Sequence, residues 1–492
     1  MTEATHPQLR LFNSLTRAVE PFTPVHAGEA RVYTCGPTVY NYAHIGNMRA
    51  YVFADVLGRT LSHAGYKLTH VINITDVGHL TDDADAGEDK LEKAARAGAQ
   101  SIWDIAAHYT AAFKADIDAL NIRQPAQWSV ATTYVLAMIA FAEKIAPRHC
   151  YELSTGLYFD TASVADYGRL ARAHTDEAAT GEGRIESVDG KRNPEDFAIW
   201  RRTPPGETRQ MEWDSPWGRG APGWHLECSV MSGELLGFPF DIHTGGIDHR
   251  EIHHPNEIAQ NQAFCCTNGL DVAANSGANL WMHNNFLVER SGKMSKSSGE
   301  FLRLQLLIDR GYHPLAYRMM CLQAHYRSEL EFTWEGLGAA LTRLKRLVMA
   351  VTNLRAQISP DTAPATPSAK FADPLARFDG ALADDLNTAV ALTVLEDVAA
   401  LKKVPVPEKL AAIARMDAVL GLDLRNLTRA DLRLRPASAT ITEAEIEAIL
   451  TARKEARAAK DFTASDALRD ELAAKGVEVM DGDPLGWDWK LD

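Results

Sequence analysis

The sequence predicts an α/β protein built on a doubly wound parallel sheet, and three neighbouring segments carry this prediction. Residues 30–34 mix small, β-branched and aromatic side chains and predict a strand that ends at Cys35-Gly36-Pro37. Residues 47–64 place apolar side chains mostly at helical spacing, and Gly65 supplies a stop. Residues 68–74 form a second apolar, β-rich run. Strand, helix and strand within about 45 residues indicate a βαβ unit, which implies a Rossmann-like sheet with helices on its faces.

The length and composition fit a globular protein of several domains. A chain of 492 residues exceeds what one hydrophobic core organises, and 46% hydrophobic with 24% charged residues is ordinary for such proteins. No apolar run approaches the roughly 20 residues that cross a bilayer, and residues 1–11 lack a signal or transit pattern. We therefore expect no membrane association and a cytoplasmic location.

Cysteine usage and charge exclude two further classes. Six scattered cysteines are too few for a disulfide scaffold, so we expect some to be buried and one or two to be ligands. A net charge of −14 excludes a protein that coats nucleic acid through a broad positive field. A local basic stripe stays compatible with RNA binding, although a solvated helix face explains the same residues: Arg343, Lys345, Arg346 and Arg355.

The patterns divide the chain into four expected parts. Residues 1–290 form the Rossmann-like domain, with an inserted connective region at about 125–220. Residues 90–146 are expected to be mainly helical, and the Gly-, Arg- and Trp-rich stretch 155–223 is expected to be an irregular module. A polar loop and a stem-contact region follow at 291–335, then a helical bundle at 336–435, interrupted by a Pro-rich link at 359–374. Residues 436–492 predict a small α+β module with helices at 442–460 and 463–475 and a strand at 477–480.

Two separated motifs suit the phosphates of a nucleotide. His44-Ile45-Gly46-Asn47 lies where the first strand passes to the first helix, so an imidazole and a helix N-terminus face any anion there. Lys293-Met294-Ser295-Lys296-Ser297 places two lysines three apart among small residues, a segment we call the lysine loop (residues 291–299). Singly, the histidine is typical of a helix cap and the loop of a surface turn. Together they supply complementary parts of phosphate stabilisation, and no Walker-type P-loop is present.

A third element follows the strand predicted at 240–243. Gly245 and Gly246 let a nucleotide approach the backbone, and the carboxylate of Asp248 can accept hydrogen bonds from ribose hydroxyls or an ammonium group. Taken singly, this segment is only a turn signal. Because ligands of such sheets bind at the carboxyl ends of strands, we expect Cys35, His44 and Thr75 near one crevice.

A metal site is the other chemistry that the residues suggest. His253 and Glu257 are four apart, on one face of a helix that must begin here because Pro255 is tolerated only in its first turn. Such a pair is more often structural than metal-binding. With Cys35 and Cys228 it makes a donor set suited to tetrahedral zinc, although the spacing alone does not bring the four together.

Several ordered motifs resemble those of the cysteinyl-tRNA synthetases, which are class I aminoacyl-tRNA synthetases. The resemblance extends nearly end to end and reaches the later helices at 384–388 and the C-terminal residues 453–489. The motifs that carry it are residues 34–40, His44-Ile45-Gly46-Asn47, Asn73-Ile74-Thr75-Asp76, Pro222-Gly223-Trp224-His225-Leu226-Glu227-Cys228, residues 253–260 and the lysine loop.

The resemblance implies a complete set of roles. The substrates would be L-cysteine, ATP with Mg²⁺, and tRNA(Cys), and one Zn²⁺ per subunit would bind the substrate thiolate. Zinc ligands would be Cys35, Cys228, His253 and Glu257. Catalytic residues would be His44, Asn47, Lys293 and Lys296, with Gly46, Gly245, Gly246, Asp248, Met294 and Ser295 also binding ATP. The amino acid would contact Gly36, Thr75, Trp224, His225 and Asp248, and we expect a monomer without an editing site.

Three departures and two alternatives accompany this interpretation. Asn47 replaces the histidine common in class I enzymes, an acidic run at 82–89 predicts a solvated loop, and Glu300 follows the lysine loop where Asn is frequent. One alternative is a related ligase that joins cysteine to an amino sugar in mycothiol synthesis, against which the long tail 341–492 argues. The other is an inactive RNA-binding paralogue. Trp487 and Trp489 are candidates for base stacking and equally for packing.

Overall fold

Five parallel strands form the central sheet of the computed structural model, which describes residues 6–77, 101–171, 188–289, 292–293, 302–359 and 365–491. The strand order is β11-β10-β3-β4-β5. The bounds are β3 Glu29–Thr34, β4 Lys67–Ile74, β5 Gln127–Val130, β10 Phe240–Gly246 and β11 Ala278–Asn284. All four neighbouring pairs run parallel. The predicted Rossmann-like fold is confirmed, and β5 is a strand that the expected run of helices at 90–146 missed.

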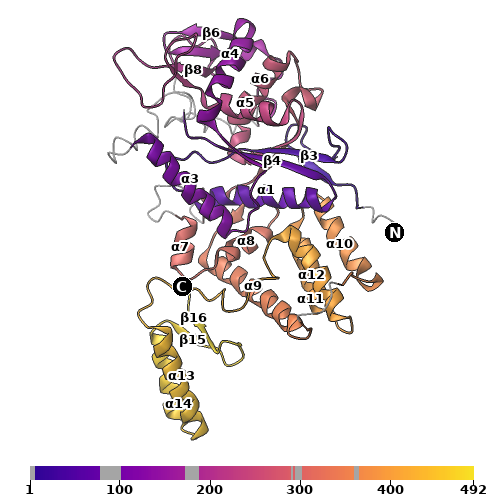
Figure 1. Ribbon diagram of the computed structural model, residues 1–492, viewed down its shortest axis with the longest axis vertical. Helices are drawn as coiled ribbons and strands as arrows, with labels where there is room; N and C mark the ends of the chain where they lie inside the picture. Colours follow the sequence, from indigo (N-terminus) through magenta and orange to yellow (C-terminus); the bar gives the residue numbers. More distant parts are fainter. Residues whose placement is uncertain are drawn as a thin grey trace.

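Helices cover both faces of this sheet (Figure 1). Helix α1 (Ile45–His63) joins β3 to β4 and packs on one face. Helices α5 (Trp224–Leu236) and α6 (His253–Cys265) lie on the other with α4 (Val135–His149), while α3 (Ile102–Ala119) packs beside α1. Because both faces are covered, the apolar residues at the strand centres are buried, among them Val32, Tyr33, Val71 and Ile72.

The order of the strands creates a switch point between β3 and β10. From β3 the chain moves outward to β4 and β5, whereas β10 and β11 add on the opposite side. Connections leaving the carboxyl ends of β3 and β10 therefore diverge and leave a crevice between them, which is where open α/β sheets bind ligands. Cys35 follows β3, and Gly246 ends β10.

The connective region is more regular than the sequence suggested. Between α4 and α5 the chain forms a four-stranded antiparallel sheet, β6 (Cys150–Leu153), β7 (Gly156–Phe159), β8 (Phe197–Arg202) and β9 (Gly220–Pro222). The expectation of an irregular module at 155–223 was wrong on this point. Its glycines mark close strand approaches rather than loops: a side chain at Gly220 would meet the carbonyl oxygen of Arg201 at 1.9 Å.

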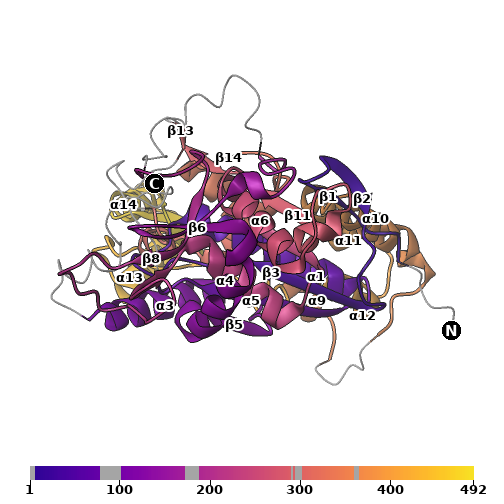
Figure 2. The ribbon, with the colours of Figure 1, turned by 90° about the horizontal axis from the view of Figure 1, so that it is seen from above.

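Two small sheets flank the central one. The hairpin β1 (Arg10–Asn13) and β2 (Ala18–Pro21) lies near β11 at the sheet edge (Figure 2). Beyond β11, strands β12 (Leu287–Glu289), β13 (Gly292–Lys293) and β14 (Leu330–Glu331) form a three-stranded sheet of order β13-β12-β14. Helices α7 (Leu304–Asp309) and α8 (Pro314–Leu322) come between β13 and β14.

The chain after β14 is helical as far as α12, and this part lies beneath α1 in Figure 1. It contains α9 (Trp334–Arg355), α10 (Ala372–Ala383), α11 (Thr388–Ala400) and α12 (Val406–Leu420). The predicted Pro-rich link is shorter than expected, because Pro374 falls in the first turn of α10, where proline is tolerated. In the described part of the chain, no helix combines the length and the apolarity that a membrane crossing needs.

The C-terminal module has its own core. Helices α13 (Glu443–Ala458) and α14 (Phe462–Ala474) pack against the antiparallel pair β15 (Val477–Val479) and β16 (Trp487–Trp489). Trp487 and Trp489 are buried in this core, so the structure supports the packing interpretation and not the stacking one. Of the basic stripe, Arg343 pairs with Glu396 at 2.6 Å and Lys345 pairs with Asp488, so neither cation stands alone.

Candidate active site

A cavity of about 330 Å³ opens at the switch point between β3 and β10. Its wall runs from Cys35, Trp224 and His253 at one end to Gly46 and Asn47 at the other. Residues 284–287, which run from the end of β11 to the start of β12, line the side of the cavity nearest the three-stranded sheet β13-β12-β14. One cavity therefore joins the predicted metal end to the predicted phosphate end.

The phosphate end is built by the cap of α1. Nδ1 of His44 accepts the backbone N–H of Asn47 at 3.3 Å, and Oδ1 of Asn47 accepts the backbone N–H of His44 at 3.2 Å. Because Nδ1 is an acceptor here, the ring proton is on Nε2, which can donate to an anion. Gly46 makes this geometry possible, since a side chain there would lie 2.9 Å from the His44 ring. Asn47 thus fixes the histidine while remaining exposed on the cavity wall.

Beyond this cap, the floor of the cavity is the end of β3. The N–H of Gly36 donates to Oδ1 of Asn73 at 2.6 Å, and a side chain at Gly36 would meet the Asn73 carbonyl oxygen at 1.5 Å. No other residue fits at position 36. Thr75 is buried and its hydroxyl donates to Glu227, so it supports α5 and does not contribute to the cavity lining.

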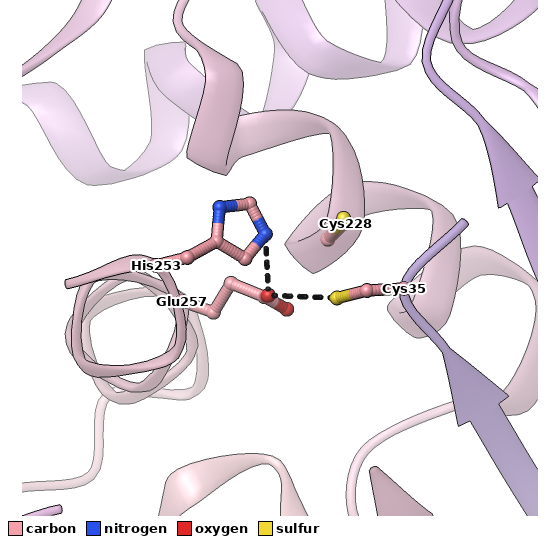
Figure 3. A group of neighbouring side chains, drawn as sticks. All are labelled: Cys35, Cys228, His253 and Glu257. Carbon is pink, nitrogen blue, oxygen red and sulfur yellow. Dashed lines mark hydrogen bonds and ion pairs between the residues drawn. The ribbon is translucent and has the colours of Figure 1, made fainter. Parts of the chain in front are cut away.

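Four side chains from three elements meet at the other end (Figure 3). Cys35 follows β3, Cys228 is on α5, and His253 and Glu257 are one turn apart on α6. Their ligand atoms all lie within 4.8 Å of one another, with Oε1 of Glu257 3.0 Å from Nε2 of His253 and 3.9 Å from Sγ of Cys35. Tetrahedral zinc, with bonds of roughly 2.0–2.3 Å, places its ligands about 3.3–3.8 Å apart. The donor set and its spacing fit zinc.

The outer atoms of this cluster are held by further histidines. Nδ1 of His253 lies 2.9 Å from Nδ1 of His225, which leaves Nε2 facing the cluster. Oε2 of Glu257 lies 2.8 Å from Nε2 of His243, which leaves Oε1 facing inward. Such outer partners orient ligands in metal sites.

A second combination shares two of these donors. His243 and His254 could replace Cys228 and His253 around Cys35 and Glu257, because those four also lie within 4.8 Å. His254 places Nε2 3.3 Å from Sγ of Cys35. However, neither His243 nor His254 lines the cavity, whereas Cys35 and His253 do. The first set therefore has two members on the cavity wall, Cys35 and His253, and the second has only Cys35.

The electrostatics of the cluster favour a cation. Burial lowers the pKa of His253, but hydrogen bonding to Cys35 and Glu257 outweighs it and raises this pKa to about 10. Burial also opposes ionisation of Cys35, yet a hydrogen bond from Cys228 and the charge of His254 bring the pKa of Cys35 well below its usual range. Burial raises the pKa of Cys228, and ionised Cys35 raises it further. The site thus retains a proton where a metal cation would bind.

The other residues expected in the site either line the cavity or lie behind its wall. Trp224, Gly246 and Asp248 line the cavity, with Trp224 4.5 Å from the His253 ring between centroids. Gly245 and His225 are behind this surface: a side chain at Gly245 would lie 2.7 Å from His254. The backbone of Lys293 pairs with Val288. Met294, Ser295 and Lys296, like the acidic run and Glu300, fall outside the described residues.

Sequence reasoning missed four histidines and one carboxylate around the cluster. His243 and His283 are on neighbouring parallel strands and face His254, whose Nδ1 is 2.7 Å from Nε2 of His283. His249 lines the cavity. Glu227 is buried, and burial raises its pKa well above the usual value. The signal available was five histidines within residues 243–283 on segments already singled out.

A further group of possible ligands occurs at the distant end of α1. Oδ1 of Asp379 lies 2.7 Å from Nε2 of His63, and its Oδ2 lies 3.7 Å from Nδ1 of His6. The same Oδ2 accepts from Arg415 at 2.7 Å. Because that guanidinium neutralises the carboxylate, this group is better suited to an ion pair than to a metal.

Comparison with known proteins agrees with this geometry. Residues 21–342 match the model of the class I (C) tRNA synthetase catalytic domain, and residues 442–484 match the cysteinyl-tRNA ligase anticodon binding domain. A cysteine–tRNA ligase of Novosphingobium aromaticivorans is 77% identical over 98% of this chain and 97% of its own. Another, of Zymomonas mobilis, is 52% identical over 100% and 99%. The chain belongs to the cysteine–tRNA ligase family.

Solved structures support the same fold at low sequence identity. A leucyl-tRNA synthetase from Agrobacterium radiobacter K84, in a ternary complex with tRNA, superposes with a TM-score of 0.54 at 14% identity, covering 84% of this chain and 87% of that one. The methionyl-tRNA synthetase of Mycobacterium tuberculosis gives 0.51 at 13%, covering 80% and 90%. The cysteine–tRNA ligase family is thus built here on the class I synthetase fold.

Proposed function

We infer that this protein is an ATP-dependent ligase that joins L-cysteine to the 3′ end of tRNA(Cys), and we propose that it recognises the thiol through zinc. One observation carries the proposal: two sulfurs, an imidazole and a carboxylate converge at one end of the cavity whose other end is the cap formed by His44 and Asn47. A substrate that spans this cavity meets a metal with its side chain and phosphates with its carboxyl end.

The specificity argument is chemical. A hydrogen-bonding pocket separates cysteine weakly from serine, because the two differ by one nearly isosteric atom. Zinc, when bound by Cys35, Cys228, His253 and Glu257, would lower the pKa of a thiol and bind it as thiolate, which an alcohol does not match. The residues of the chain then orient the rest of the amino acid. Trp224 and Asp248 both line the cavity, and the carboxylate of Asp248 would accept the ammonium group.

Activation follows from the opposite end. The carboxylate of cysteine attacks the α-phosphate of ATP, and pyrophosphate leaves with Mg²⁺. His44 donates from Nε2 to the phosphate oxygens, and Asn47 holds the ring in that orientation. Lys293 and Lys296 would neutralise the charge that develops on the α-phosphate. The terminal adenosine hydroxyl of the tRNA then displaces AMP, with no covalent enzyme intermediate.

The C-terminal module distinguishes this proposal from the mycothiol-type ligase. Its matched residues 442–484 belong to an anticodon binding model, and a ligase for an amino sugar has no use for such a module. We further propose domain limits of 1–290, 291–335, 336–435 and 436–492. The monomeric state and the cytoplasmic location stay predictions.

The test offers zinc-loaded protein one amino acid and one acceptor at a time. We expect cysteine-dependent pyrophosphate exchange, at least about a hundredfold preference over serine, and charging of tRNA(Cys) with none of the glucosaminyl inositol acceptor. Exchange with cysteine but transfer only to the sugar would support the mycothiol-type activity. Folded protein that binds no zinc when zinc is supplied, and that shows no exchange, would support the inactive paralogue.

A further inference from the structure

A buried arginine immediately follows the phosphate-binding cap. Arg49 is on α1, two residues beyond Asn47, and only 2% of it is exposed. Its guanidinium donates to four backbone carbonyl oxygens. Nη1 reaches Asn285 at 2.9 Å and also Phe286, and Nη2 reaches Ser328 at 2.6 Å and His325 at 3.3 Å.

This arrangement is unusual for a buried cation. Among the described residues no carboxylate lies within ion-pair distance of Arg49, so neutral carbonyl dipoles alone replace its water. Burial accordingly lowers the pKa of Arg49. A buried charge that stabilises only backbone is expensive to retain, because replacing it with an apolar side chain avoids the desolvation. An apolar side chain at this position would leave the four carbonyl oxygens without this donor, so the guanidinium joins the segments that carry them.

The four carbonyls belong to two segments that lead into the three-stranded sheet β13-β12-β14. Asn285 and Phe286 immediately precede β12, while His325 and Ser328 precede β14. Strand β12 pairs with both β14 and β13. Strand β13 ends at Lys293, the first lysine of the lysine loop. Arg49 therefore fixes the base from which the lysine loop departs.

The segment after the lysine loop is tied to the same turn of α1. The N–H of Ile45 donates to the carbonyl of Leu302 at 2.8 Å, and the hydroxyl of Tyr317 on α8 donates to the carbonyl of Ile45. Both sides of the loop are thus bonded to the first turns of α1, whose cap holds His44 and Asn47. The described segments before and after the lysine loop are therefore both hydrogen-bonded to the start of the helix that carries the His44 cap.

We propose that Arg49 is a positioning residue that holds the three-stranded sheet, and with it strand β13 that ends at Lys293, against the first turns of α1 during amino acid activation. This inference rests on the proposed function. The planar fork of arginine reaches carbonyls of two segments at once, whereas the single ammonium of lysine cannot reproduce that pattern. A displacement of about 1 Å between the motifs is enough to slow the reaction by about a hundredfold.

The test compares Arg49→Lys with Arg59→Lys. Arg59 is a matched control because it is on the same helix and bonds Asp55 and the backbone carbonyls of Asn121 and Ala418, away from the small sheet. Cysteine-dependent pyrophosphate exchange is measured with zinc-loaded enzyme, and rates are expressed per active site by the burst of adenylate. For Arg49→Lys we expect kcat at saturating ATP to fall at least about tenfold, with KM for cysteine within about threefold and zinc content unchanged.

Arg59→Lys should lose thermal stability with kcat retained. A kcat for Arg49→Lys equal to that of wild type, whether or not stability falls, would overturn the inference. Should that variant fail to fold, Tyr317→Phe removes a bond from the other side of the loop and should lower kcat in the same direction by a smaller factor; an unchanged kcat there would also overturn it. Absence of exchange in the wild type would instead refute the proposed function.

Discussion

Nδ1 of His225 and Nδ1 of His253 lie 2.9 Å apart in a fully buried contact between α5 and α6. One nitrogen donates and the other accepts, and the contact leaves Nε2 of His253 directed toward Cys35, Cys228 and Glu257; metal binding through that Nε2 requires Nδ1 of His253 to be the donor. His225, which we expected to contact the amino acid, therefore lies where it orients His253 of the predicted zinc site.

We predict that His225→Asn weakens zinc binding by about 10- to 100-fold, because an outer partner of a ligating histidine sets its orientation. Competition with a chelator of known affinity measures this change. His149→Asn serves as the control, since His149 is partly buried and bonded to Ser163 in the connective region. Equal zinc affinity in His225→Asn and wild type would show that the contact does not orient the ligand.

For Cys228→Ser we predict loss of stoichiometric zinc together with loss of the preference for cysteine over serine. A hydroxyl is a poorer zinc ligand than a thiolate, and the cavity without zinc has only shape with which to choose. Metal analysis and exchange with each amino acid test both results in one preparation. Cys265→Ser, an exposed cysteine at the end of α6, should change neither. A variant that keeps the thiol preference without zinc would contradict the proposed recognition.

The fold was predictable where local pattern and tertiary structure agree. Apolar runs at 30–34 and 68–74 separated by a helical period dictate β3, α1 and β4, because a buried parallel strand needs apolar residues on both faces. Strand β5 was missed because Gln127–Val130 is a short edge strand with no such run. The sheet of the connective region was missed because its glycines, which permit close strand approach, read locally as turns.

The site was predictable only in part for a different reason. The donor types and the helical spacing of His253 and Glu257 are local facts, but the meeting of Cys35 with Cys228 depends on the order of strands β10 and β3. The supporting residues His225 and His243 are on α5 and β10, whereas their partners are on α6, so no local period relates His225 to His253 or His243 to Glu257. Arg49 gives no local sign of its role, because its four partners are backbone carbonyls.

The C-terminal module is joined to the rest of the protein by a buried network. Asp488 on β16 accepts from Arg429 and from Lys345 on α9, and Arg429 also bonds Asp483 at 2.8 Å. We predict that Asp488→Asn releases the module, because it leaves the buried Arg429 and the half-buried Lys345 without their shared carboxylate. KM for tRNA should rise about tenfold or more, while cysteine-dependent pyrophosphate exchange stays within about twofold.

The matched control for that network is Asp481→Asn, which removes an exposed carboxylate paired with Arg453 and Arg457 inside the module. Exposed pairs contribute little, so aminoacylation should be nearly unchanged. An Asp488→Asn enzyme with normal KM for tRNA would show that the network does not set the position of the module. Equal losses of exchange and aminoacylation would indicate damage to the whole protein instead.

A buried histidine in the sheet predicts part of the acid sensitivity of the fold. His70 is on β4, with Nε2 2.8 Å from the hydroxyl of Thr34, and burial lowers its pKa from 6.5 to about 4. Between these values the unfolded chain binds a proton that the folded protein does not, so the free energy of unfolding falls as pH falls below about 6.5. The contribution lost between pH 7 and pH 5 is about 2 kcal/mol.

We predict that His70→Gln, whatever its stability at pH 7, loses about 2 kcal/mol less than wild type over this interval in urea unfolding. Any release of zinc at low pH would affect both proteins equally and cancel in the comparison. The control is His108→Gln, at an exposed site on α3, which should lose as much free energy of unfolding as wild type. Parallel losses for His70→Gln and wild type would mean that the imidazole of His70 is protonated in the folded protein at pH 5, against the burial that the parallel sheet imposes on it.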